Sequence, residues 1–159
     1  MPNARNLAIL TAAVLAASCE NPVSPYIGDD GSGEIVVDFD TRPDRWPLDP
    51  YVVDAARIDA DTLVLRIDHG GGCRSHAFAL VAWDGWLESI PVQVHVVLAH
   101  EDRDDPCDAL LRSHLKFDLS PLRAAFTAAY RGESGSMLIR LSNPMAPGGP
   151  PLHTLLYEF

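Results

Sequence analysis

Positive charge is scarce in this sequence. Its 159 residues hold 12 Lys and Arg against 22 Asp and Glu, which gives a net charge of −10 at pH 7. A chain with this balance repels the phosphates of DNA and RNA, so we exclude nucleic acid as a partner. The length and the apolar content are sufficient for one domain with a hydrophobic core.

Motifs of catalysis are also missing from the sequence. It contains no Gly-x-Ser-x-Gly segment of the kind that presents a nucleophilic serine. Gly70–Gly72 is not followed by the Lys-Ser or Lys-Thr pair that a phosphate-binding loop requires. The acidic residues are too scattered for a catalytic pair to be selected. We therefore predict a protein that is not an enzyme and that holds no cofactor.

Long hydrophobic runs are lacking except near the N-terminus. After the positive charge of Arg5, residues 7–18 (LAILTAAVLAAS) form an apolar run that is short for a membrane-spanning helix. Small residues then precede Cys19, which is the pattern of a secretory signal. We predict that residues 1–18 are a signal peptide and that the protein is exported.

The stretch LAASC at residues 15–19 resembles the lipobox of bacterial lipoproteins, with its leucine one position further from the cysteine than usual. The resemblance implies cleavage before Cys19 and acylation of its sulfur and amine. Several fatty chains give a stable anchor, so a membrane is an expected partner. Because Glu20 rather than Asp follows the cysteine, the sorting rule of Gram-negative bacteria implies the outer membrane, with the domain facing the periplasm or the cell surface.

Residues 19–33 combine the cysteine with a segment rich in Pro, Gly, Ser and Asp. Because no apolar periodicity is present there, we interpret the segment as a flexible tether between the lipid and the domain. A single domain is predicted to occupy residues 34–159.

Apolar and polar residues alternate in short segments throughout that domain, which is typical of half-buried strands. Ser120-Pro121 and Gly132 indicate the start and the end of a short helix at about 121–131. We predict an all-β fold, an immunoglobulin-like antiparallel β-sandwich of about seven strands with this one helix. The predicted strands are residues 35–39, 51–58, 62–68, 76–83, 92–98, 114–119, 136–141 and 153–159.

Asp84-Gly85 lies between two apolar segments and predicts a two-residue hairpin turn, because both turn positions favour positive φ. In that register His76 lies opposite Gln93. His100 lies opposite His69, and its seven-residue separation from Gln93 corresponds to about 23 Å along a strand. This register places the histidines of the two cysteine-containing segments far apart.

Cysteine is rare as well, with three in the chain. If Cys19 carries lipid, Cys73 and Cys107 remain, 34 positions apart. Two cysteines in an exported domain commonly form a disulfide, because the periplasm is kept oxidising. A disulfide closing a loop of that length contributes about 4 kcal/mol to stability. We favour the Cys73–Cys107 disulfide.

A zinc site is the alternative for the same region. Cys73, His76, His100 and Cys107 provide two sulfurs and two imidazoles, which is a tetrahedral zinc ligand set. One Cys-x-x-His pair is a weak signal, and the register above opposes it. A third hypothesis is a histidine-only site beside the disulfide, with His69 and His100 opposed. The acidic loop at residues 101–108 lacks the regular spacing of a calcium loop, and we interpret it as a solvated turn.

Two functions follow from these observations. We expect an exported, lipid-anchored protein of the cell envelope with a non-enzymatic binding or structural domain, whose partner would be another envelope protein. The alternative is an envelope lipoprotein that binds zinc or copper through the four residues of the zinc set.

Overall fold

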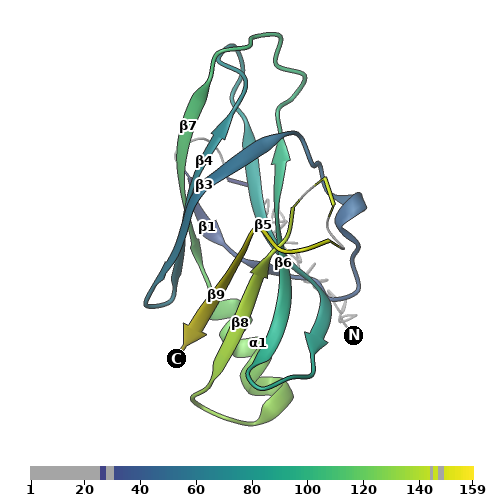
Figure 1. Cartoon of the computed structure of the whole chain (residues 1–159), viewed down its shortest axis with the longest axis vertical. Coiled ribbons are helices and arrows are strands. Elements are labelled where there is room, and N and C mark those ends of the chain that lie inside the picture. The colour runs from purple at the N-terminus through teal and green to yellow at the C-terminus, as the bar shows by residue number, and fades with distance from the viewer. Residues whose placement is uncertain (1–25, 28–30, 144, 147–148) are drawn as a thin grey trace, which may run out of the picture.

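Two β-sheets lie face to face in this protein, and one helix lies at their lower end (Figure 1). The computed structural model describes residues 26–27, 31–143, 145–146 and 149–159. The first sheet has the strand order β1-β7-β4-β3, with bounds Ser32–Glu34, Leu111–Asp118, Thr62–His69 and Tyr51–Asp59. The second has the order β2-β5-β6-β8-β9, with bounds Val36–Val37, Ala77–Leu87, Val92–Glu101, Ser136–Leu141 and His153–Glu158. The helices are η1 (Pro43–Arg45) and α1 (Ser120–Tyr130).

The predicted β-sandwich is confirmed, and its framework is the seven strands from β3 to β9. The pairings are mixed, however, because β1–β7, β2–β5 and β6–β8 are parallel. Parallel neighbours require a crossover connection. Between β6 and β8 the chain passes through β7 in the other sheet and then through α1. The prediction that every pairing is antiparallel therefore does not hold.

The hydrophobic core lies between the two sheets and follows the alternation seen in the sequence. Alternate residues of β4, β6 and β7 point inward, and those in the middle of the sandwich are fully buried. The hairpin of β3 and β4 forms as predicted, with Asp59 paired to Thr62. The inward residues of the three strands are Leu63, Leu65 and Ile67; Val94, Val96 and Leu98; and Leu115 and Phe117.

Asp84-Gly85 does not form the predicted hairpin turn. Both residues have positive φ (61° and 69°), but they lie inside β5, and the register with β6 shifts between Trp83 and Trp86. The chain reverses only after Leu87, before β6 begins at Val92. Because the segments on both sides of Asp84-Gly85 pair with β6, the two residues bend the strand as a bulge.

The corrected register brings together histidines that the sequence analysis had separated. His100 pairs with Phe78, two residues after His76, and not with His69. The distance argument against a site shared by His76 and His100 is therefore wrong.

The described domain begins before residue 34. Ile27 exchanges two backbone hydrogen bonds with Phe78, of 2.7 and 2.8 Å. The carbonyl of Gly31 accepts a bond of 2.7 Å from the Lys116 N–H, and β1 then pairs with β7. These parts of the predicted tether thus belong to the sandwich, because they pair with β5 and β7. The predicted signal peptide and Cys19 lie outside the described residues.

Helix α1 begins one residue earlier than predicted. Leu119 is its N-cap, and the Asp118 carboxylate accepts hydrogen bonds from the N–H and the hydroxyl of Ser120. Its C-cap is Arg131 in the left-handed conformation, not Gly132. The helix buries two apolar residues against the sandwich. No helix in the described part of the chain combines the length and the apolar character needed to cross a membrane.

Candidate functional site: a buried histidine cluster beside the disulfide

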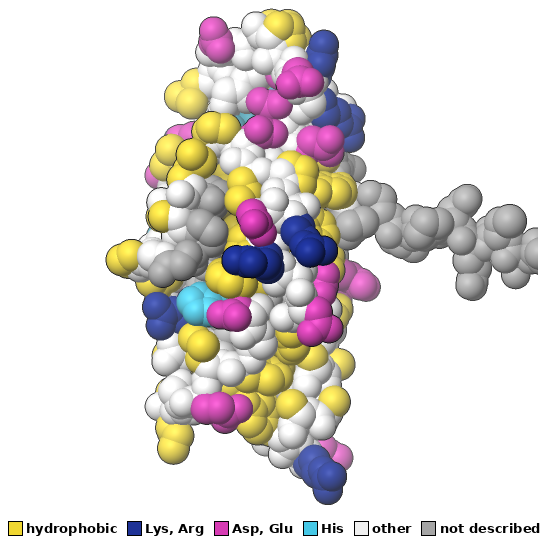
Figure 2. Space-filling view, turned by 90° about the vertical axis from the view of Figure 1, so that its right-hand side faces the viewer, with side chains coloured by type: hydrophobic (Ala, Val, Ile, Leu, Met, Phe, Trp, Pro, Cys, Tyr) yellow, Lys and Arg dark blue, Asp and Glu magenta, His cyan; other side chains and the backbone are white. Residues whose placement is uncertain are grey.

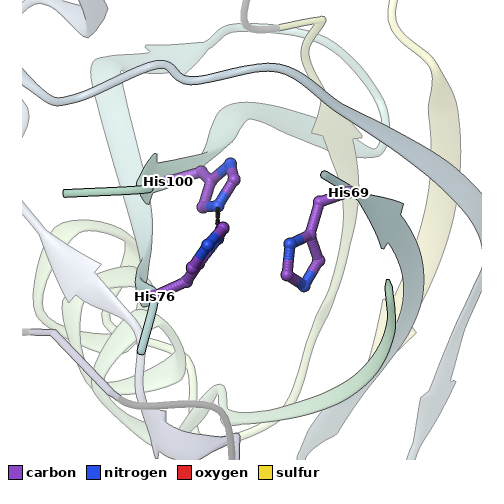
Figure 3. A group of neighbouring side chains, drawn as sticks. All are labelled: His69, His76 and His100. Carbon is purple, nitrogen blue, oxygen red and sulfur yellow. Dashed lines mark hydrogen bonds between the residues drawn. The ribbon is translucent and has the colours of Figure 1, made fainter. Parts of the chain in front are cut away.

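Three histidines gather at the end of the sandwich where β4 and β6 finish (Figure 3). His69 is the last residue of β4, His76 precedes β5, and His100 lies near the end of β6. Their exposed fractions are only 4%, 2% and 1%. We call these three residues the histidine cluster.

Strand alternation explains why the cluster is buried. His69 occupies the inward position that follows Leu63, Leu65 and Ile67 on β4. His100 likewise follows the inward row of β6, and His76 precedes the row that Phe78 begins on β5. Each imidazole therefore extends the core at one end of the two sheets.

The rings face one another across the gap between the sheets. Figure 3 shows His76 and His100 on one side and His69 opposite them. The ring centroids are 4.6 Å apart for His69 and His76, 5.2 Å for His69 and His100, and 5.0 Å for His76 and His100. Phe78 stacks on His100 with centroids 4.7 Å apart. One ring nitrogen from each histidine lies within 4.8 Å of the other two.

Every ring has hydrogen-bonding partners. His76 Nδ1 lies 2.8 Å from His100 Nε2, and His76 Nε2 lies 3.3 Å from the Asp105 carboxylate. His100 Nδ1 lies 3.2 Å from the carbonyl of Asp49. His69 contacts the Gly70 carbonyl through Nδ1 and the Ser113 hydroxyl through Nε2, both at 2.9 Å. Burial is the largest cause that lowers the pKa of His100.

Beside the cluster, Cys73 and Cys107 form the predicted disulfide, with their Cα atoms 5.7 Å apart. The bond joins the loop after β4 to the acidic loop after β6. Gly71 and Gly72 have φ values of 135° and 121°, which side chains rarely adopt. A Cβ on Gly71 would lie 2.4 Å from His76 Nε2, so this position requires glycine.

Asp105 fastens these two loops to each other. Its carboxylate accepts backbone N–H bonds from Gly72, Cys73, Arg74 and Cys107, at 2.8 to 3.0 Å. Its side chain is only 2% exposed. Burial alone would raise the pKa of this carboxyl, but the backbone N–H groups and His76 hold it well below its ordinary value. Asp105 is therefore an ionised, buried acceptor, which corrects the interpretation of the acidic loop as merely a solvated turn.

A cavity of about 200 Å³ opens beside the cluster. Its lining includes His100 and the carboxylates Asp102, Asp105 and Asp108. Figure 2 shows acidic side chains gathered toward the upper end of the face in view, which is the end where β4 and β6 finish in Figure 1. The cavity thus joins buried imidazole to an acidic surface.

The structure separates the residues of the predicted zinc set into two groups. His76 and His100 are in contact, whereas both sulfurs are bonded to each other and are not available as ligands. His69, which the four-residue set omitted, takes the place beside the two imidazoles. The third hypothesis, a histidine-only site, describes the observed arrangement better, although the predicted pairing of His69 with His100 was wrong.

Replacing Asp105 by Asn is expected to lower the melting temperature by several degrees at pH 7, because the four N–H donors lose a charged acceptor. Because the pKa of Asp105 is lower in the folded protein, its carboxylate stabilises the fold at pH values above the unfolded pKa of 3.8. This stabilisation is lost as the pH falls through the pKa of the folded protein. The difference between the two proteins should therefore narrow below pH 3.8. Thermal unfolding followed by circular dichroism measures the melting temperature of each protein across this pH range. Asp108→Asn, at an exposed position, is the control, and equal losses in both variants would refute this role of Asp105.

Two solved structures with a similar fold come from Bacteroides species. A NigD-like immunity protein from Bacteroides caccae ATCC 43185 matches with a TM-score of 0.54 at 17% identity, over 71% of this chain and 53% of its own. A protein of unknown function from Bacteroides vulgatus ATCC 8482 matches with a TM-score of 0.52 at 12% identity, over 81% of this chain and 57% of its own. The chain thus spans little more than half of either structure. At these identities the likeness shows the fold alone. No protein-family model and no curated protein matches the sequence.

Proposed function

We propose that this protein is exported, held in the outer membrane by lipid on Cys19, and acts there as a non-enzymatic binding module. The observation that carries the proposal is the Cys73–Cys107 disulfide. Structural disulfides persist in oxidising compartments and are rare in the bacterial cytosol, so the bond indicates an extracytoplasmic protein. The lipobox-like residues 15–19 supply a means of retention at the membrane.

The non-enzymatic part of this proposal is supported by the surroundings of a serine that contacts a histidine. The Ser113 hydroxyl lies 2.9 Å from His69 Nε2, as a nucleophilic serine lies from its base. In such enzymes a carboxylate orients the other ring nitrogen. Here that nitrogen, Nδ1, contacts the carbonyl of the adjacent Gly70. The pair lacks this orienting charge, and we assign it a structural role.

The end of the sandwich beside the disulfide is the surface that we propose for binding. The loops after β4 and β6 are fixed to each other there by the disulfide and by Asp105, so the surface is organised before any partner arrives. The acidic residues at this end favour a partner with a complementary positive surface, such as a basic region of another envelope protein.

Metabolic labelling with a palmitate analogue tests the proposed anchor. We expect the wild-type chain, expressed in a Gram-negative host, to carry label and to fractionate with the outer membrane. Cys19→Ala should lose the label, whereas the Cys73→Ser/Cys107→Ser variant should keep it, because the lipid is assigned to Cys19 alone. A wild-type chain that is produced but unlabelled would rule out the lipid anchor.

A further inference from the structure

The histidine cluster brings together nitrogen atoms that can bind a metal, which the proposed lipid-anchored binding module does not require. We propose that His69, His76 and His100 bind one divalent transition-metal cation of the zinc class. The ligands are one ring nitrogen from each residue, and these atoms lie within 4.8 Å of one another. Imidazole nitrogens are preferred ligands of Zn²⁺ and Cu²⁺.

The ring hydrogens of His76 and His100 favour a cation between the two rings. His76 Nε2 faces the Asp105 carboxylate, and His100 Nδ1 faces the Asp49 carbonyl, and both of these oxygens accept hydrogen bonds. The facing nitrogens, His76 Nδ1 and His100 Nε2, lie 2.8 Å apart. Three contacts therefore link Asp105, His76, His100 and Asp49, but two neutral rings carry only two hydrogens between them. One of the three contacts is left without a hydrogen, whichever tautomers the rings adopt.

A cation between His76 Nδ1 and His100 Nε2 removes this shortage of hydrogens. A metal ion uses the lone pairs of both nitrogens, and the outer N–H groups then donate to the Asp105 carboxylate and the Asp49 carbonyl. Metal-bound histidines commonly donate their second N–H to a carboxylate or a backbone carbonyl. Asp105 and Asp49 already occupy those positions.

His69 completes the set from the opposite sheet. Figure 3 shows its ring facing the other two. When Nδ1 turns from the Gly70 carbonyl to the cation, the hydrogen moves to Nε2 and is donated to the Ser113 hydroxyl, which accepts as readily as it donates. Zn–N bonds of about 2.0–2.1 Å place tetrahedral ligands about 3.3 Å apart, so the His76–His100 contact must open by about 0.5 Å.

The nearby carboxylates and the cavity that adjoins the histidine cluster also favour a cation. The Asp105 carboxylate, 2% exposed and 3.3 Å from His76 Nε2, offsets part of the charge of the ion. Asp102 and Asp108 line the adjoining cavity of about 200 Å³, which gives the ion a route to the cluster and leaves room for a water in the fourth position. The disulfide fixes both loops and withholds both sulfurs from the metal.

Zinc binding to the intact protein, produced without a polyhistidine tag and stripped with chelator, tests this proposal. Competition against a chromophoric chelator under oxidising conditions should show one Zn²⁺ per chain. His69→Gln and His76→Gln should each weaken binding by about 100-fold or more, since each removes a ligand. His114→Gln, at an exposed position on β7, is the matched control and should bind as wild type.

Asp105→Asn is the second variant, because it leaves all three ligands in place. Its loss of the carboxylate behind His76 should weaken zinc binding by about 10- to 100-fold. Circular dichroism must show that each variant is folded before its affinity is compared. No zinc binding by the folded, oxidised wild type overturns the proposal, as does binding that the His69 and His76 variants retain. Binding that appears only after reduction of the disulfide also overturns it and favours ligands that include the cysteines. These results do not depend on lipid at Cys19.

Discussion

Replacing Cys73 and Cys107 together by Ser is expected to lower the free energy of unfolding by about 4 kcal/mol. The disulfide joins residues separated by 34 positions, and its loss returns the corresponding loop-closure entropy to the unfolded chain. A domain of this size has a stability of only about 5–15 kcal/mol, so the variant should be marginal at 37 °C. Urea unfolding followed by tryptophan fluorescence and by circular dichroism measures the change.

The reduced wild-type protein is the matched control for this variant. In the presence of dithiothreitol it should show a similar loss, because the cross-link is broken without any change of sequence. A double variant that stays within about 1 kcal/mol of the oxidised wild type would show that the disulfide does not stabilise this fold.

Phe78→Ala is expected to cost about 3–5 kcal/mol, as for other fully buried phenylalanines. Phe78 is 0% exposed and belongs to the main core. It also stacks on His100 and packs in a T-shaped arrangement against His69, with ring centroids 5.5 Å apart for the second pair. The substitution leaves a void directly beneath the histidine cluster, so the loss of core packing and the loosening of two imidazoles should occur together.

Equilibrium unfolding in urea measures this loss also. Met145→Ala is the control, because Met145 is 73% exposed and surface substitutions usually change stability by less than about 0.5 kcal/mol. If Phe78→Ala cost no more than the control, Phe78 would not support the core at the histidine end, and the packing described here would be wrong.

The sequence predicted the sandwich because alternation is a local property of each strand. Leu63, Leu65 and Ile67 point inward wherever β4 lies in the sheet, and the same holds for β6 and β7. Strand order and direction depend on pairings between distant segments. The parallel contact of β6 with β8 and the entry of Ile27 beside Phe78 leave no local signature in the sequence.

For Asp84-Gly85 the sequence predicted the correct backbone conformation but the wrong structural element, a hairpin turn in place of a bulge. Both residues adopt the positive φ that the turn prediction required. The same conformation serves a bulge when the residues on both sides continue to pair with one strand. The error moved the register of β5 against β6, and with it the expected distance between His76 and His100.

The candidate site was predictable in part. The disulfide and the proximity of His76 and His100 to it were among the hypotheses drawn from the sequence. His69 could have been assigned to the set by extending the inward row of β4 by two residues, and the same step places His100 after Leu98. The role of Asp105 depends on four backbone N–H groups from two loops, and no pattern of residue types encodes that convergence.

The metal environment tests the account most directly, because it distinguishes the histidine cluster from the cysteine-containing set in one experiment. X-ray absorption at the zinc K edge of the oxidised, zinc-loaded protein should show imidazole nitrogens at about 2.0–2.1 Å and no sulfur neighbour. A sulfur shell at about 2.3 Å would contradict the account, since it requires Cys73 or Cys107 to leave the disulfide and bind the metal.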